Sequence, residues 1–71
     1  MTLDQFRLSK GWNYKQLAEF LGHEQRVVRR WCLPFGSAEF RRPHDTTRFS
    51  IVTKTGGAVG LADWFPAETP A

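Results

Sequence analysis

The 71-residue sequence has a single cysteine and no long hydrophobic run. Cys32 alone excludes an internal disulfide and cannot form a zinc cluster, so the core must be stable without such cross-links. No apolar run approaches the roughly 18 residues that span a bilayer, and the N-terminal residues lack the hydrophobic region of a signal peptide. We therefore expect one soluble domain with a small core, located in the cytoplasm.

Signatures of catalysis and of cofactor binding are also missing. The sequence shows no Ser-His-Asp pattern, no pair of carboxylates at catalytic spacing and no glycine-rich phosphate loop. His23 and His44 stand apart from any partner at metal-ligand spacing. We expect neither an enzyme nor a protein that holds a metal or an organic cofactor, and we expect Cys32 to be a small buried apolar residue.

The sequence does contain a strongly basic middle. Residues 23–54 carry seven basic and three acidic residues, a net charge of +4, whereas residues 1–22 carry +1 and residues 55–71 carry −2. Such a distribution is typical of a protein with a polyanionic partner. Charge alone does not separate this interpretation from a charged surface that only contacts water.

Two capping boxes predict where the first helices begin. Thr2 followed by Gln5 is one, and Asn13 begins a second N-x-x-Q pattern. Gly11 and Gly22 are placed to end these helices, because glycine accepts the left-handed conformation that follows a helix. A third helix is expected to begin near Glu24 and to end before Pro34, followed by a loop over residues 33–43.

The third helix is predicted to have two unlike sides. At about 100° per residue, Val27, Val28 and Trp31 share one side. The opposite side carries Gln25, Arg26, Arg29 and Arg30. We expect the apolar side to hold the helix against the protein and the polar side to face a partner. The core is predicted from Trp12, Leu17, Leu21, Val28 and Trp31.

Residues 46–55 are ambiguous. The stretch TTRFSIVTKT is rich in Thr, Val, Ile and Phe, which slightly favours a strand, and a hairpin could turn at Gly56 and Gly57. The alternative is a helix that begins near His44 or Asp45 and ends at Gly56. Farther along, Leu61, Trp64 and Phe65 form an apolar cluster that either closes the core or contacts a second copy.

The spacing over residues 14–32 is that of a helix-turn-helix, in which small Ala18 lets the next helix cross closely. The sequence resembles the phage-repressor and Cro class of helix-turn-helix regulators, which have a lambda-repressor-like DNA-binding domain. The matching residues are Leu17-Ala18, Leu21-Gly22, Val28 and Trp31, with TGGAV at residues 55–59 and DWF at residues 63–65. The resemblance implies an all-α, compact bundle of four to five short helices, with residues 45–55 helical. It places the DNA-binding domain at residues 1–66 and a frayed tail at residues 67–71.

The resemblance also implies a location, the cytoplasm of a bacterial host cell, and a function. We expect a transcriptional repressor that binds double-stranded DNA as a homodimer on an inverted repeat, with the third helix in the major groove. The residues expected at base edges are Gln25, Arg26 and Arg29, of which Arg26 also flanks the phosphates. The residues expected at phosphates are Lys15, Gln16, Arg30, Arg41, Arg42 and Arg48.

Two other functions compete with this one. An antitoxin-like module would bind and neutralise a protein partner, using its C-terminal tail, and would also repress its own operon. RNA binding through the basic face is a second alternative, although a rigid helix suits the major groove of DNA better than the narrow major groove of RNA.

Overall fold

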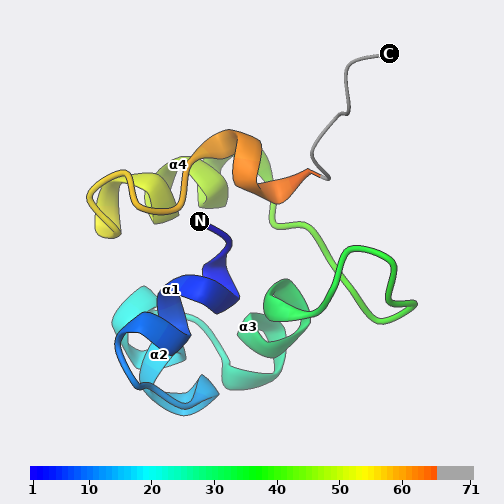
Figure 1. Ribbon diagram of the computed structural model, residues 1–71, viewed down its shortest axis with the longest axis horizontal. Coiled ribbons are helices and arrows are strands. Elements are labelled where there is room, and N and C mark those ends of the chain that lie inside the picture. The colour runs from blue at the N-terminus through cyan, green and yellow to red at the C-terminus, as the bar shows by residue number, and fades with distance from the viewer. Residues whose placement is uncertain (66–71) are drawn as a thin grey trace.

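A computed structural model describes residues 1–65, and over that range the chain is helical, without strands. The elements are α1 (Leu3–Ser9), α2 (Tyr14–Leu21), α3 (Gln25–Cys32), α4 (Asp45–Lys54) and a short 3-10 helix, η1 (Leu61–Trp64). In Figure 1, α1 lies between α4 on one side and the pair α2 and α3 on the other. The expectation of a small all-α bundle is confirmed. The tail predicted at residues 67–71 lies outside the described residues.

Both predicted capping boxes are present. The Oγ1 atom of Thr2 accepts from the Gln5 amide at 3.2 Å, and the Thr2 amide donates to Oε1 of Gln5 at 2.8 Å. At the start of α2, Asn13 and Gln16 exchange the same two bonds, at 2.8 and 2.9 Å. Side chains three residues apart therefore fix the beginnings of α1 and α2.

Positive-φ glycines follow the ends of three helices, as the sequence predicts. Gly11 has φ +68°, and the amide after it, that of Trp12, donates to the Arg7 carbonyl at 3.1 Å. Gly22 has φ +76°, and the next amide likewise donates back to α2. Gly56, with φ +63°, ends α4 in the same way. These bonds satisfy carbonyl groups that the helix itself leaves free.

The segment from Asp45 to Lys54 is a helix, so the local preference for a strand is wrong and the expectation from the resemblance is confirmed. Ile51 is the fully buried residue of this helix and lies in the core, at 1% exposure, whereas Thr47, Ser50 and Val52 are only partly buried. The hydroxyl of Thr53 donates to the Phe49 carbonyl at 3.2 Å, and that of Thr55 donates to the Ile51 carbonyl at 2.8 Å. These threonines are thereby accommodated in a helix despite their β-branched side chains.

One core joins all the elements. Its buried members are Leu3, Phe6, Leu17, Ala18, Leu21, Val28, Trp31, Cys32, Ile51, Val59 and Trp64. Trp12 departs from the prediction, since it is only half-buried and lies at the edge of the core, with its ring 6.0 Å from that of Phe6 and 5.1 Å from that of Phe20. Trp12 therefore packs against two other aromatic rings at the edge of the core and not inside it.

The C-terminal apolar cluster is divided between two environments. Trp64 is 1% exposed and closes the core, whereas Leu61 and Phe65 are 42% and 47% exposed. Asp63 holds η1 in place, because its Oδ2 atom accepts from the Gly60 amide at 2.8 Å and from the amino group of Met1 at 3.1 Å. Of the two alternatives for this cluster, core closure therefore holds for Trp64 alone of the three residues.

Candidate nucleic-acid interface

Helix α3 has one buried side and one exposed side. Val28, Trp31 and Cys32 are buried, whereas Gln25, Arg26, Arg29 and Arg30 are exposed. This confirms that the polar residues project outward. Three buried side chains hold the helix against the protein, and guanidinium and amide groups cover its other side. Such a helix is suited to contacting a polar, negatively charged partner.

The buried side is rotated from the predicted one. Val27 is 37% exposed, so the expectation that it packs inward is wrong. Cys32 lies one turn after Val28 and is buried, as expected, which centres the buried side on these two residues with Trp31 at its margin. Val27 then falls beyond Trp31, at the boundary with solvent.

The connection from α2 to α3 is three residues long and holds the two helices in close contact. Gly22 supplies the left-handed turn, and Ala18 and Leu21 are buried where α2 packs against α3. The His23 ring meets the edge of Trp31, with 5.0 Å between ring centroids. Glu24 precedes the first turn of α3 without a side-chain cap bond. The orientation of α3 is therefore fixed mainly by packing.

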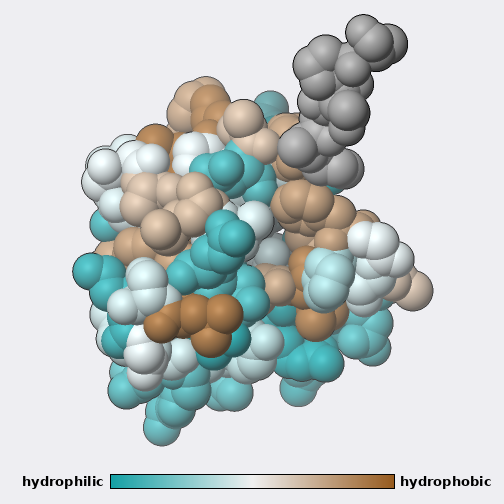
Figure 2. All heavy atoms as spheres, in the orientation of Figure 1, coloured by the Kyte–Doolittle hydropathy of each residue, from teal (hydrophilic) through white to brown (hydrophobic). Residues whose placement is uncertain are grey.

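The three residues predicted at base edges share one hollow of the surface. Gln25, Arg26 and Arg29 line a shallow depression together with Glu24. Hydrophilic residues dominate the edge of the molecule formed by α2 and α3, and apolar residues are more frequent toward α4 and η1 (Figure 2). The structure thus brings together the base-contact candidates on one accessible surface.

One of these residues already has a partner. Nη1 of Arg29 lies 3.4 Å from Oε2 of Glu39, which belongs to the loop after α3. Both side chains remain largely exposed, at 50% and 66%. Within residues 1–65, the guanidinium groups of Arg26 and Arg30 have neither a hydrogen bond nor an ion pair.

The arginines of the loop are engaged with the protein itself. Nη1 of Arg41 donates to the carbonyls of Phe40 at 3.1 Å and Ala38 at 3.5 Å. Nε of Arg42 donates to the Trp64 carbonyl at 2.7 Å, and its guanidinium group lies 4.3 Å from the centroid of the Phe65 ring. The phosphate contacts predicted for both remain predictions, but Arg42 also has a clear role in joining the loop to η1.

The remaining phosphate candidates lie on α2 and α4. Arg48 pairs with Asp45, its side chain is 16% exposed, and its guanidinium group lies 5.3 Å from the Phe65 ring centroid. Lys15 is exposed in the first turn of α2. Gln16 is exposed as well, although its carbonyl oxygen is used in the capping box. Arg48 is therefore the least accessible of the predicted phosphate contacts.

Two basic residues outside the predicted site have structural roles. Nζ of Lys54 donates to the Leu21 carbonyl at 2.6 Å and so ties α4 to the end of α2. Arg7 bonds Asp4 at 2.8 Å and donates to the Trp12 carbonyl at 3.0 Å. The role of Arg7 could have been predicted from the sequence, because Asp4 and Arg7 are spaced to share one helix face. No local pattern indicates the role of Lys54, since 33 positions separate it from Leu21.

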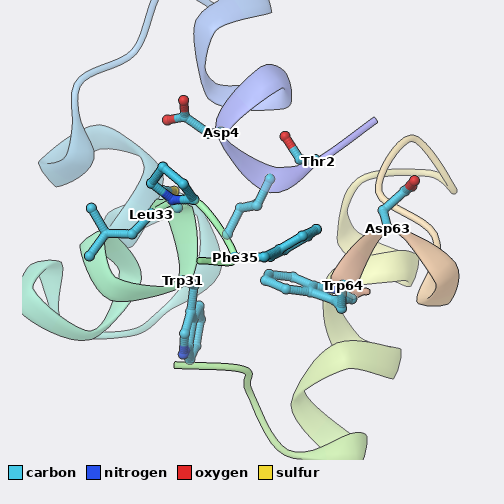
Figure 3. Close-up of a pocket in the computed structure, with 10 residues that line it drawn as sticks. Thr2, Asp4, Trp31, Leu33, Phe35, Asp63 and Trp64 are labelled. Atoms are coloured by element: carbon cyan, nitrogen blue, oxygen red, sulfur yellow. The ribbon is translucent and has the colours of Figure 1, made fainter. Parts of the chain in front are cut away.

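A separate, mainly apolar cavity of about 260 Å³ lies between the start of α1, the end of α3, the following loop and η1. Figure 3 shows side chains from all four segments around it, among them Trp31, Phe35 and Trp64. Burial raises the pKa of the Cys32 thiol to about 12, so the thiol is protonated and unreactive near neutral pH. Asp63 is held by Gly60 and Met1.

Comparison of the chain with protein-family models, with curated proteins and with solved structures found no match. Among the described residues, no helix has the length and apolar character needed to cross a membrane. Residues 1–65 also contain no group of three or more His, Cys, Asp or Glu side chains placed to hold a metal ion.

Proposed function

We propose that this chain is a sequence-specific double-stranded DNA-binding protein and that α3 enters the major groove. In this proposal α2, the connection and α3 act as a helix-turn-helix, and the protein represses transcription by covering a promoter. It is not an enzyme. The exposed side of α3 is the observation that carries the proposal, because it presents Gln25, Arg26, Arg29 and Arg30 together while the other side is buried.

The dimensions and chemistry of α3 support this assignment. An α-helix with its side chains is about 10–12 Å in diameter, and the major groove, about 12 Å wide, admits one. Glutamine can bond N6 and N7 of adenine, and arginine can bond O6 and N7 of guanine. Gln25 and Arg29 lie one turn apart and line the same depression, so both could meet neighbouring base edges.

A neighbouring column of side chains suits the DNA backbone. Arg26 and Arg30 are one turn apart and free of other partners within the described part of the chain. Guanidinium groups bind phosphate oxygens in a forked geometry. Lys15, at the start of α2, is exposed and could contact the next phosphate. We assign Arg30 and Lys15 to phosphates, and Arg26 to the boundary between bases and backbone.

Two copies are needed for adequate specificity. A single helix of this kind reaches only a few base pairs, so a symmetric pair on an inverted repeat is the simplest arrangement. We therefore propose a homodimer, at least on DNA. Sedimentation of the protein with its selected duplex should show two chains, and one chain per duplex would contradict this part of the proposal.

The function can be tested by selecting duplexes from a random library with the wild-type chain. Gln25→Ala and Arg29→Ala should each weaken binding to the selected duplex by about 1–3 kcal/mol and relax the preference at one base pair. Lys10→Ala, which removes an exposed charge at the end of α1, is the matched control and should leave base preference unchanged. Affinity of the wild type should fall steeply as salt rises.

Two results of the selection and one of the salt titration would contradict the proposal. One is the failure of the selection to enrich any sequence. The other is unchanged relative affinities of both α3 variants for duplexes mutated at single positions. Binding that is indifferent to salt between low and physiological concentrations would also exclude this mode of contact.

A further inference from the structure

The loop between α3 and α4 places a carboxylate beside the proposed base-contact surface. We propose that Glu39 is a specificity-determining residue. Its negative charge repels a DNA phosphate that approaches Arg29, so that Arg29 binds the neutral edge of a base instead. This inference rests on the proposed DNA-binding function and adds a residue from outside the helix-turn-helix segment.

The placement of Glu39 follows from turns within the loop. The Ser37 amide donates to the Pro34 carbonyl at 2.9 Å, and the Phe40 amide donates to the Ser37 carbonyl at 3.2 Å. The hydroxyl oxygen of Ser37 accepts from the Glu39 amide at 3.3 Å. The backbone around Glu39 is therefore folded into two consecutive turns.

The same loop is joined to α3 and to η1. The Arg41 amide donates to the Arg30 carbonyl at 3.4 Å, and the rings of Phe35 and Phe40 meet edge to face at 5.1 Å. Two residues farther on than Phe40, Arg42 bonds the Trp64 carbonyl. These contacts on both sides of Glu39 hold its backbone close to α3, and its carboxylate reaches Arg29 on the outward side of that helix.

The geometry of the ion pair leaves Arg29 able to bind DNA. Only Nη1 contacts Glu39, and a guanidinium group has five N–H donors in all. The pair is exposed, so its contribution to the stability of the fold is small. Arg29 can therefore donate to another acceptor while Glu39 stays close.

The two acceptors that DNA offers differ in charge. The O6 and N7 atoms of guanine are neutral, whereas a phosphate brings a negative charge toward the Glu39 carboxylate. Repulsion from Glu39 thus penalises a phosphate at Arg29 more than it penalises guanine. Because non-specific binding consists mainly of phosphate contacts, Glu39 should weaken non-specific binding more than specific binding.

The test compares Glu39→Gln with wild type on two duplexes, one selected from a random library by the wild-type chain and one with the same bases scrambled. At low salt, Glu39→Gln should raise affinity for the scrambled duplex about two- to fivefold more than for the selected one. It should also relax the preference at the base pair assigned to Arg29 and leave that of Gln25 intact. Glu19→Gln, an equal change of charge on the exposed surface of α2, is the control.

Equal changes in Glu39→Gln and Glu19→Gln would overturn the inference, since net charge would then explain both. An unchanged preference at the Arg29 base pair would overturn it as well. These results leave the proposed DNA-binding function standing. If the wild-type chain selects no sequence at all, the proposed function fails, and the role of Glu39 fails with it.

Discussion

The arginines of α3 and those of residues 41–48 are the same side chain in two different surroundings. Arg26 and Arg30 extend from a helix whose opposite side is buried, and no group within residues 1–65 bonds their guanidinium groups. The guanidinium groups of Arg42 and Arg48 instead both lie against the exposed Phe65 ring, at 4.3 and 5.3 Å from its centroid, and Arg42 also bonds the Trp64 carbonyl. An arginine contributes positive charge in both regions, but Arg26 and Arg30 make no side-chain bond within residues 1–65, whereas Arg42 and Arg48 already contact other parts of the protein.

The arginines of the two regions therefore have different roles. The region around η1 uses arginine to hold a loop and a short helix together, and the α3 region presents arginine outward. A cation next to an aromatic face and a carbonyl is stabilising without any external anion. The comparison can be tested by changing the residues on which each region depends.

The largest expected effect comes from the anchor of the η1 region. Trp64→Ala removes a side chain that is 1% exposed and should lower the free energy of unfolding by about 3–5 kcal/mol. In a domain of this size, such a loss is a large part of the total stability. Denaturant unfolding followed by circular dichroism measures it, and loss of the helical signal in buffer would be the extreme form of the same result.

Leu61→Ala is the control for that substitution, because Leu61 belongs to the same short helix but is 42% exposed. It should cost about 1 kcal/mol or less. Equal losses from Trp64→Ala and Leu61→Ala would contradict the assignment of Trp64 as the residue that closes the core.

An intermediate effect should separate the two kinds of arginine. Arg42→Ala should lower the free energy of unfolding by about 1–2 kcal/mol, because a bond to a carbonyl and a contact with an aromatic ring are lost. Arg30→Ala should leave stability nearly unchanged and reduce the salt dependence of DNA binding by roughly one unit of slope. Thermal unfolding and DNA titrations at several salt concentrations measure both quantities. A loss of stability in Arg30→Ala but not in Arg42→Ala would contradict the structural role given to Arg42 and the DNA-binding role given to Arg30.

The smallest effect concerns Asp63 and pH. Burial works to raise the pKa of Asp63, but the Gly60 amide and the Met1 ammonium group outweigh it and lower this pKa below its usual value. The stabilisation is therefore present above the usual aspartate pKa of about 3.9 and is lost as pH falls through the lower value of the folded state. Since the side chain is partly exposed, we expect about 0.2–1 kcal/mol.

Asp63→Asn, which cannot ionise, provides the comparison. Its free energy of unfolding should change less than that of the wild type between pH 5 and pH 2, measured on protein with a free Met1 amino group. Identical pH profiles for the two proteins would show that the Asp63 contacts do not contribute to stability.

Much of the fold was predictable because it depends on close neighbours in the chain. Thr2 with Gln5 and Asn13 with Gln16 form capping boxes in which the partners are three residues apart. Gly22 ends α2 with a positive φ, which glycine adopts without a steric penalty. The polar side of α3 was equally visible, since side chains one turn apart share a face.

The candidate site was predictable only in part. The shared depression of Gln25, Arg26 and Arg29 agrees with the helical spacing. The exposure of Val27 was missed, because periodicity alone does not show whether Val27 or Cys32 lies at the margin of the buried side. Glu39 was missed as well, since no pattern in a loop indicates that its tip returns to α3.

The sequence by itself determined where α1 and α2 begin and end and that α3 has one apolar and one basic side. These features arise from interactions between residues three to five positions apart. Only the tertiary structure decided that residues 45–54 form a helix, where the burial of Ile51 and the bond from Lys54 to Leu21 outweigh the local preference for a strand. It also decided which arginines are engaged, because the bond between Arg42 and Trp64 joins residues 22 positions apart, and no local rule specifies a contact at that distance.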